Sequence, residues 1–178
     1  MKNKNKLNYN FKYSGLIIFV AGAIASFGFA PFHYFPLTIL SYVFLIHFLV
    51  ISQKEKKNIF FCSFFYGLGT HIGLLYWIAI SFQTANSGGY FLGAVAVLIL
   101  CSFLSIFIAI PFYLIFRFSK SFKDINFGLF FIFIFTIFDW LKGNILWGFP
   151  WTPISSIWAF NSFTLYPFSV LGVWGYSL

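Results

Sequence analysis

Residues 90–116, YFLGAVAVLILCSFLSIFIAIPFYLIF, form a run without a single charged side chain. An α-helix rises about 1.5 Å per residue, so a helix over this run would exceed the roughly 30 Å hydrocarbon thickness of a bilayer. The run therefore predicts a membrane-spanning helix.

The whole chain shares this apolar character. Of its 178 residues, 61% are hydrophobic and only 8% are charged, and its mean hydropathy is +0.90. Soluble domains carry about 25% charged residues. The composition excludes an ordinary soluble domain and predicts an all-α polytopic membrane protein.

Four further apolar runs predict four more spans. The five predicted spans are 14–30, 37–51, 58–83, 90–116 and 125 to about Trp140, and a sixth begins near Phe160. Residues 1–13 are predicted to be a basic cytoplasmic tail and residues 14–178 a transmembrane region. The first run continues into a second without a convincing cleavage site, which favours an uncleaved helix over a signal peptide.

The basic residues orient these spans. They cluster before the first run, after the second and after the fourth, so a cytoplasmic N-terminus places all of the 11 Lys and Arg residues inside except Lys142. We expect residues 29–36, 84–89 and 143–153 on the outer face. The net charge of +8 is divided among these clusters, and we expect no nucleic-acid partner.

Small residues recur at four-residue spacing in two spans. Gly22, Ser26 and Ala30 share one side of the first, and Gly69 and Gly73 share one side of the third. Small side chains let membrane helices approach closely, so the spacing predicts helix–helix packing. No internal repeat is visible, which argues against a small transporter.

The stretch TIFDWLKGNILWGFPW, residues 136–151, holds Asp139, the only acidic residue inside a predicted span. A carboxylate at the bilayer centre costs on the order of 3 kcal/mol and should face protein, water or a partner. Lys142 lies three residues later on the same helical face, so an ion pair is available. Two interpretations remain open: an anchoring pair at the helix end, or a site for a polar or lipid headgroup at the outer leaflet.

Aromatic residues gather near the same predicted boundary, where amphipathic rings settle at headgroup level. Pro150, with Phe149 and Trp151, is expected to stop the helix and begin a re-entrant or interfacial turn. Together with the ion pair, the predicted lipid- or substrate-binding residues are Asp139, Lys142, Phe149, Pro150, Trp151, Tyr76 and Trp77.

No catalytic constellation is recognisable among the remaining polar residues. GxSxG, HExxH and phosphate-binding loop motifs are missing from the sequence, as are paired carboxylates at a useful spacing. His47 and His71 lie in predicted spans, and we interpret them as hydrogen-bonded packing residues rather than a proton relay. His33, in an outer loop, is expected to be solvated.

The two cysteines also lie inside apolar runs. Cys62 and Cys101 have neither CxxC nor Cys/His ligand spacing, so we interpret them as small buried hydrophobic residues. No disulfide, metal site or cofactor is predicted.

Four stretches, taken in order, resemble one family. FGFAPFHYFPL (27–37), GLGTHIGLLYWIAIS (67–81), DWLKGNILWGFPW (139–151) and YPFSVLGVWGYSL (166–178) look like consecutive membrane-region motifs of bacterial apolipoprotein N-acyltransferases. The resemblance covers residues 15–178. It implies a periplasmic nitrilase-like domain whose Glu, Lys and Cys move an acyl chain from a phospholipid, through a cysteine thioester, to the α-amino group of a lipoprotein's lipidated N-terminal cysteine.

The sequence departs from the family pattern at three positions. The family usually has Asp in place of His33, Glu in place of Asp139 and Arg in place of Lys142. Lys lacks the planar fork that binds a carboxylate or phosphate through two hydrogen bonds, so we expect less specific binding. Cys62 and Cys101 match no nucleophile motif, and the sequence predicts no catalytic residue.

Two functions are therefore expected. The chain is either the membrane portion of an apolipoprotein N-acyltransferase-like protein, truncated and inactive alone, or a non-catalytic membrane scaffold or remnant. The first function implies the bacterial inner membrane as its location and the phospholipid bilayer, a phospholipid acyl donor and a lipoprotein as partners. It also allows a separate chain carrying the catalytic domain. The abrupt end of the sequence within an apolar run favours truncation.

Overall fold

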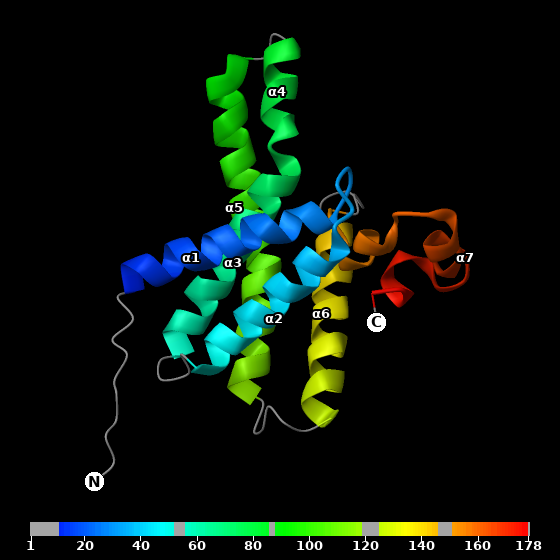
Figure 1. Ribbon diagram of the computed structural model, residues 1–178. Coiled ribbons are helices and arrows are strands. Elements are labelled where there is room, and N and C mark those ends of the chain that lie inside the picture. Colours follow the sequence, from blue (N-terminus) through cyan, green and yellow to red (C-terminus); the bar gives the residue numbers. More distant parts are fainter. Residues whose placement is uncertain (1–10, 52–55, 86–87, 119–124, 146–150, 178) are drawn as a thin grey trace.

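The computed structural model describes residues 11–51, 56–85, 88–118, 125–145 and 151–177. All regular secondary structure in these ranges is helical, which confirms the expected all-α class (Figure 1). The elements are α1 (Phe11–Ala25), η1 (Ser26–Gly28), α2 (Phe35–Ile51), α3 (Lys56–Leu75), α4 (Trp77–Thr84), α5 (Gly89–Phe118), α6 (Ile125–Ile145), η2 (Ile154–Trp158) and α7 (Ser162–Gly175).

Three of the described helices are long and apolar enough to cross a membrane. The qualifying segments are Asn58–Leu75, Gly89–Phe118 and Phe127–Ile145, from α3, α5 and α6. Gly15–Gly28 and Phe35–Ile51 are shorter apolar segments. A helix suits such sequences because it satisfies the hydrogen bonds of its own backbone. The hydrocarbon of a bilayer offers backbone N–H and C=O groups no hydrogen-bonding partner.

The first helix ends earlier than predicted. The Ser26 hydroxyl donates to the Ala23 carbonyl at 2.7 Å, and the chain turns through η1 after Ala25. Ala30 therefore lies outside the helix and is exposed. Its assignment to the row of small packing residues is wrong, whereas Gly22 and Ser26 are both buried.

The third predicted span is divided into two helices at Tyr76. The Ala79 N–H bonds to the Tyr76 carbonyl, only three residues back, so the helical ladder tightens at this point. Tyr76 keeps helical dihedral angles, with φ −55° and ψ −30°. In Figure 1, α4 and the first half of α5 extend as a hairpin beyond the level at which α1, α2 and α6 end.

The last two helices also differ from their predicted bounds. α6 continues to Ile145, past the expected end near Trp140, and so includes Lys142. α7 begins at Ser162 with a capping box between Asn161 and Thr164. Its regular geometry is broken at Gly172, where φ is +69°. The sixth run thus starts as a helix but is kinked near its end.

Small residues join α1 to α3 as the sequence predicted. A Cβ atom on Gly22 would collide with the Tyr66 carbonyl oxygen, and one on Gly69 would collide with the Phe19 carbonyl oxygen. The Thr70 hydroxyl also donates to the Gly22 carbonyl at 3.1 Å. The two backbones therefore touch directly, and any larger side chain would separate them.

The interior where the helices meet is largely aromatic. Tyr42 of α2 packs edge-on against Tyr66 of α3, with ring centroids 5.2 Å apart, and against Phe135 of α6, with centroids 6.3 Å apart. Phe112 of α5 is fully buried and lies 5.0 Å from the Phe135 ring. These rings come from α2, α3, α5 and α6 and pack together beside the second half of α6.

Candidate functional site

The site is built on the last turns of α6. Asp139 and Lys142 lie one turn apart, and Lys142 Nζ is 2.6 Å from Asp139 Oδ1. Their side chains are only 10% and 6% exposed. The predicted ion pair is confirmed, and it is buried by protein rather than open at a helix end.

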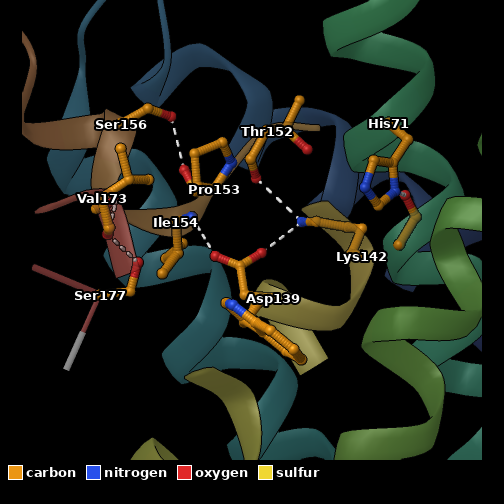
Figure 2. Close-up of polar contacts among 12 residues, drawn as sticks. His71, Asp139, Lys142, Thr152, Pro153, Ile154, Ser156, Val173 and Ser177 are labelled. Atoms are coloured by element: carbon orange, nitrogen blue, oxygen red, sulfur yellow. Dashed lines mark hydrogen bonds and ion pairs between the residues drawn. The ribbon is translucent and has the colours of Figure 1, made fainter. Parts of the chain in front are cut away.

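Each partner of the pair also binds the chain that follows α6. Asp139 Oδ2 accepts a hydrogen bond from the Ile154 N–H at 3.0 Å, and Lys142 Nζ donates to the Thr152 carbonyl oxygen at 3.2 Å (Figure 2). A buried ion pair is favourable only when further hydrogen bonds complete its coordination, and these two bonds do so. The pair therefore binds residues 152–154 to the C-terminal part of α6.

Two further contacts hold the same segment. Trp151 packs against a cluster from α3 and α5 that includes Leu75, Val97 and Leu104. At the other end, the Ser155 hydroxyl donates to the Val173 carbonyl at 2.9 Å. The ion pair, Trp151 and Ser155 thus fix residues 151–155 against α3, α5, α6 and α7.

His71 of α3 lies beside this anchor. Its Nδ1 atom is 2.8 Å from the Gly67 carbonyl oxygen, and a carbonyl can only accept, so in the neutral ring Nδ1 carries the proton and Nε2 keeps its lone pair. Figure 2 shows the ring facing the Lys142 side chain. His71, Asp139, Lys142 and Thr152 bring polar groups to one cavity of about 30 Å³ that apolar side chains otherwise line; it has room for a water molecule and is called the polar cavity below.

A second, larger hollow lies on the other side of Tyr42. This apolar groove of about 260 Å³ runs between α2 and α6 and is closed at one end by Ile154 and Ile157. Tyr42, Phe135 and Ile154 line both the polar cavity and the apolar groove. These three side chains form the wall between a polar and an apolar compartment.

Comparison with known proteins places this arrangement in a family. The model of the apolipoprotein N-acyltransferase N-terminal domain matches residues 21–178. The chain belongs to this family. It is 29% identical over 159 residues to an apolipoprotein N-acyltransferase of Haemophilus influenzae, covering 85% of this chain and 28% of that protein. It is 26% identical over 162 residues to one of Rickettsia typhi, covering 91% and 32%. The chain thus spans less than a third of the length of these relatives.

The remaining predicted site residues divide into two groups. Tyr76 and Trp77, at the junction of α3 and α4, are 59% and 52% exposed, and neither lines the polar cavity. Their assignment to an apolipoprotein N-acyltransferase lipid site stays a prediction. Phe149 and Pro150 lie outside the described residues.

The structure confirms the interpretation of one of the three histidines and contradicts the other two. His71 is buried and hydrogen-bonded, as expected. His47 is exposed on α2, so its interpretation as a packing residue is wrong, because its face of α2 points away from the neighbouring helices. His33 is only partly exposed, with its Nδ1 atom buried and φ at +57°, so the expectation of a solvated side chain is also wrong.

Sequence reasoning missed the roles of Tyr42, Thr152 and Ile154. Thr152 and Ile154 act through backbone atoms, which no side-chain pattern reveals. Tyr42 is one aromatic residue among many in a chain with 10 Tyr and 30 Phe. The only usable signal was the proximity of residues 152–154 to Asp139 along the chain.

The site supports positioning rather than covalent chemistry. Cys62 and Cys101 are 4% and 0% exposed and lie within helix contacts. In the part of the chain that the structure describes, no three His, Cys, Asp or Glu side chains are grouped to hold a metal ion. What the geometry does provide is a rigid attachment of the segment after α6.

Proposed function

We propose that this chain is the membrane portion of an apolipoprotein N-acyltransferase-like protein in the bacterial inner membrane. It would serve the transfer of an acyl chain from a phospholipid to the lipidated N-terminal cysteine of a lipoprotein. The match of residues 21–178 to the family model carries this proposal. The catalytic Glu, Lys and Cys would come from a nitrilase-like domain outside these residues, on the same polypeptide or on a second chain.

We place five spans in this membrane portion, with the N-terminus in the cytoplasm. α1, α2, the joined α3 and α4, α5 and α6 are the five spans, and α7 is the start of a sixth. The positions of Lys and Arg support this orientation. In Figure 1, η1, the facing ends of α4 and α5 and the C-terminal end of α6 lie toward one end of the molecule, which is consistent with a common side for these helix ends.

The polar site would then act at the outer face. Asp139 and Lys142 hold residues 152–154 in place, and Trp151, Tyr76 and Trp77 would contact lipid headgroups around them. Because Lys142 is already paired with Asp139 and Thr152, the pair positions this surface and does not serve as a free phosphate site. The phospholipid donor and the lipoprotein would approach the catalytic domain across it.

Complementation tests the functional proposal. The 178-residue chain alone is expected not to convert diacylated to triacylated lipoprotein in a strain depleted of its own acyltransferase, because Cys62 and Cys101 are buried. A chimera that joins this chain to the remaining residues of a relative is expected to restore conversion, measured by mass spectrometry of lipoprotein N-termini. A chimera that is inserted and folded but inactive would favour a non-catalytic scaffold.

Topology reporters test the orientation. Alkaline phosphatase, which is active only outside the cytoplasm, is expected to be active when fused after Gly88 and inactive when fused after Asp124. The physical reason is the retention of basic clusters on the cytoplasmic side. Reversed activities at the two sites would contradict the proposed orientation without bearing on the family.

A further inference from the structure

One wall of the polar cavity carries an unused hydrogen-bond acceptor. His71 is 1% exposed, and its Nδ1–H donates to the Gly67 carbonyl. The second ring nitrogen, Nε2, therefore carries a lone pair. This nitrogen makes no hydrogen bond to any residue that the structure describes. A buried acceptor without a partner destabilises a folded protein, so a donor is expected beside Nε2.

The Lys142 ammonium group brings an unused donor to the same cavity. Its nitrogen carries three protons, and Lys142 is 5% exposed. One proton is donated to Asp139 Oδ1 and a second to the Thr152 carbonyl, which leaves the third. In Figure 2 the His71 ring has a nitrogen on the side toward Lys142. The unused donor and the unused acceptor thus belong to neighbouring side chains that do not bond to each other directly.

The space beside these two groups fits one small polar molecule. The cavity of about 30 Å³ matches the volume that one molecule occupies in liquid water. Much of its remaining wall is apolar and includes Phe29, Leu74 and Phe107. Tyr42 also lines the cavity, and its hydroxyl, which can donate or accept, has no hydrogen bond within the described part of the chain. A buried water makes about three hydrogen bonds, and these polar groups can supply them.

We propose that the polar cavity binds one water molecule, which donates a hydrogen bond to His71 Nε2 and accepts one from the Lys142 ammonium group. Lys142 thereby gains its third acceptor, and α3 is joined to the ion pair that holds residues 152–154. His71 is a positioning residue for this segment, and it acts through the water and Lys142. A water-mediated bond is nearly as favourable as a direct one.

The charges around the cavity favour water over an ion. A cation would be repelled by the Lys142 ammonium group, and an anion would gain little because Asp139 already neutralises that group. Water carries no charge and both donates and accepts, as the two unused groups require. The site does not depend on the acyltransferase proposal, since no substrate or second chain takes part in it.

Solid-state NMR of the full chain in lipid bilayers tests the water directly. The chain is deuterated, labelled with nitrogen-15 at histidine and returned to ordinary water, and His71 is assigned from its own backbone signals. We expect Nδ1 to be protonated and Nε2 to be unprotonated. The strongest through-space transfer to Nε2 is expected from protons at the frequency of water. A direct bond would instead give transfer from the ammonium protons of Lys142.

Two replacements of His71 separate hydrogen bonding from packing. His71→Phe keeps a ring of similar size but has no acceptor, whereas His71→Gln loses the ring and places an oxygen close to the position of Nε2. Both lose the bond to Gly67. Hydrogen exchange at the Ile154 N–H is expected to be about fivefold faster in His71→Phe and within about twofold of the parent in His71→Gln. A packing role would produce the opposite order.

His47→Phe is the matched control, because it makes the same replacement at an exposed position of α2 and should leave exchange at Ile154 unchanged. Three results would overturn the proposal. They are a protonated Nε2, transfer to Nε2 from the Lys142 ammonium protons in place of water, and equal or slower exchange in His71→Phe than in His71→Gln. The NMR readout uses the unmodified chain, so a variant that fails to fold leaves the test intact.

Discussion

Replacing Asp139 with Asn is expected to lower the unfolding temperature by about 10 °C, the largest effect of any single charge change among the residues that the structure describes. Asn is close to Asp in size and retains an oxygen that can accept from the Ile154 N–H. The change therefore removes the negative charge and replaces the oxygen that accepts from Lys142 with an NH2 donor, so the buried Lys142 ammonium keeps its bond to the Thr152 carbonyl but has no counter-charge. Breaking one side of a buried ion pair costs about 3–5 kcal/mol.

Unfolding is measured by the reactivity of the two buried cysteine thiols. Cys62 and Cys101 are 4% and 0% exposed, so a thiol-reactive fluorogenic dye reports unfolding of the detergent-solubilised chain. Arg117→Met is the control, because Arg117 is an exposed cation at the end of α5. Its removal should change stability by no more than about 0.5 kcal/mol. Equal melting temperatures for Asp139→Asn and Arg117→Met would show that the ion pair does not stabilise the fold.

Two double variants test separately how the buried charge affects stability and how the pair binds residues 152–154 to α6. Asp139→Asn with Lys142→Met removes both charges and should recover much of the loss, because an uncharged pair leaves no buried ion. The exchange Asp139→Lys with Lys142→Asp keeps opposite charges, but Lys cannot accept from Ile154 and Asp cannot donate to Thr152. We expect the exchanged pair to leave residues 151–158 unprotected in hydrogen exchange. Full protection would contradict the anchoring role.

The second large effect is expected from adding one methyl group to Gly22 or Gly69. In each variant the new Cβ collides with a backbone carbonyl on the partner helix, at Tyr66 or Phe19, and backbone cannot move aside as a side-chain tip can. Overpacking of this kind costs about 1–3 kcal/mol and sometimes more. Gly22→Ala and Gly69→Ala should each lower the unfolding temperature in the thiol assay, because α1 and α3 are forced apart.

Gly128→Ala is the matched control. Gly128 lies in α6, a helix long and apolar enough to cross a membrane, but a Cβ built on it has no neighbour within 4 Å. Ala is a better helix former than Gly by about 1 kcal/mol, so this variant should be as stable as the parent chain or slightly more so. If Gly22→Ala proved as stable as Gly128→Ala, the close approach of α1 and α3 would not contribute to stability.

Much of the fold followed from local properties of the sequence. The apolar run at 90–116 became α5, within two residues at each end, since hydropathy and helix length are read directly from the chain. The four-residue spacing of Gly22 and Ser26, and of Gly69 and Gly73, correctly marked the α1–α3 contact. Family membership also followed from local motifs, and the match to residues 21–178 bears it out.

Local patterns failed where a boundary depends on a neighbouring helix. Hydropathy continues past Ala25, yet α1 ends there, where the Ala25 carbonyl accepts a hydrogen bond from the Thr38 hydroxyl of α2 and the chain turns toward that helix. Hydropathy likewise gave no sign of the division at Tyr76. His47 and His71 both looked like packing histidines in apolar helices, but only His71 faces a neighbour. Which face of a helix is covered is decided by the other helices.

The sequence by itself determined that this is a helical membrane protein of the apolipoprotein N-acyltransferase family and that Asp139 and Lys142 can pair, because a spacing of three residues places them on one helical face. Only the tertiary structure decided what the pair does. The second oxygen of the Asp139 carboxylate binds the Ile154 N–H, and the Lys142 ammonium group binds the Thr152 carbonyl. Nothing in the side chains of Ile154 and Thr152 predicts these backbone bonds. The groove between α2 and α6 likewise arises from residues distant in sequence, whose common surface exists only once the helices have packed.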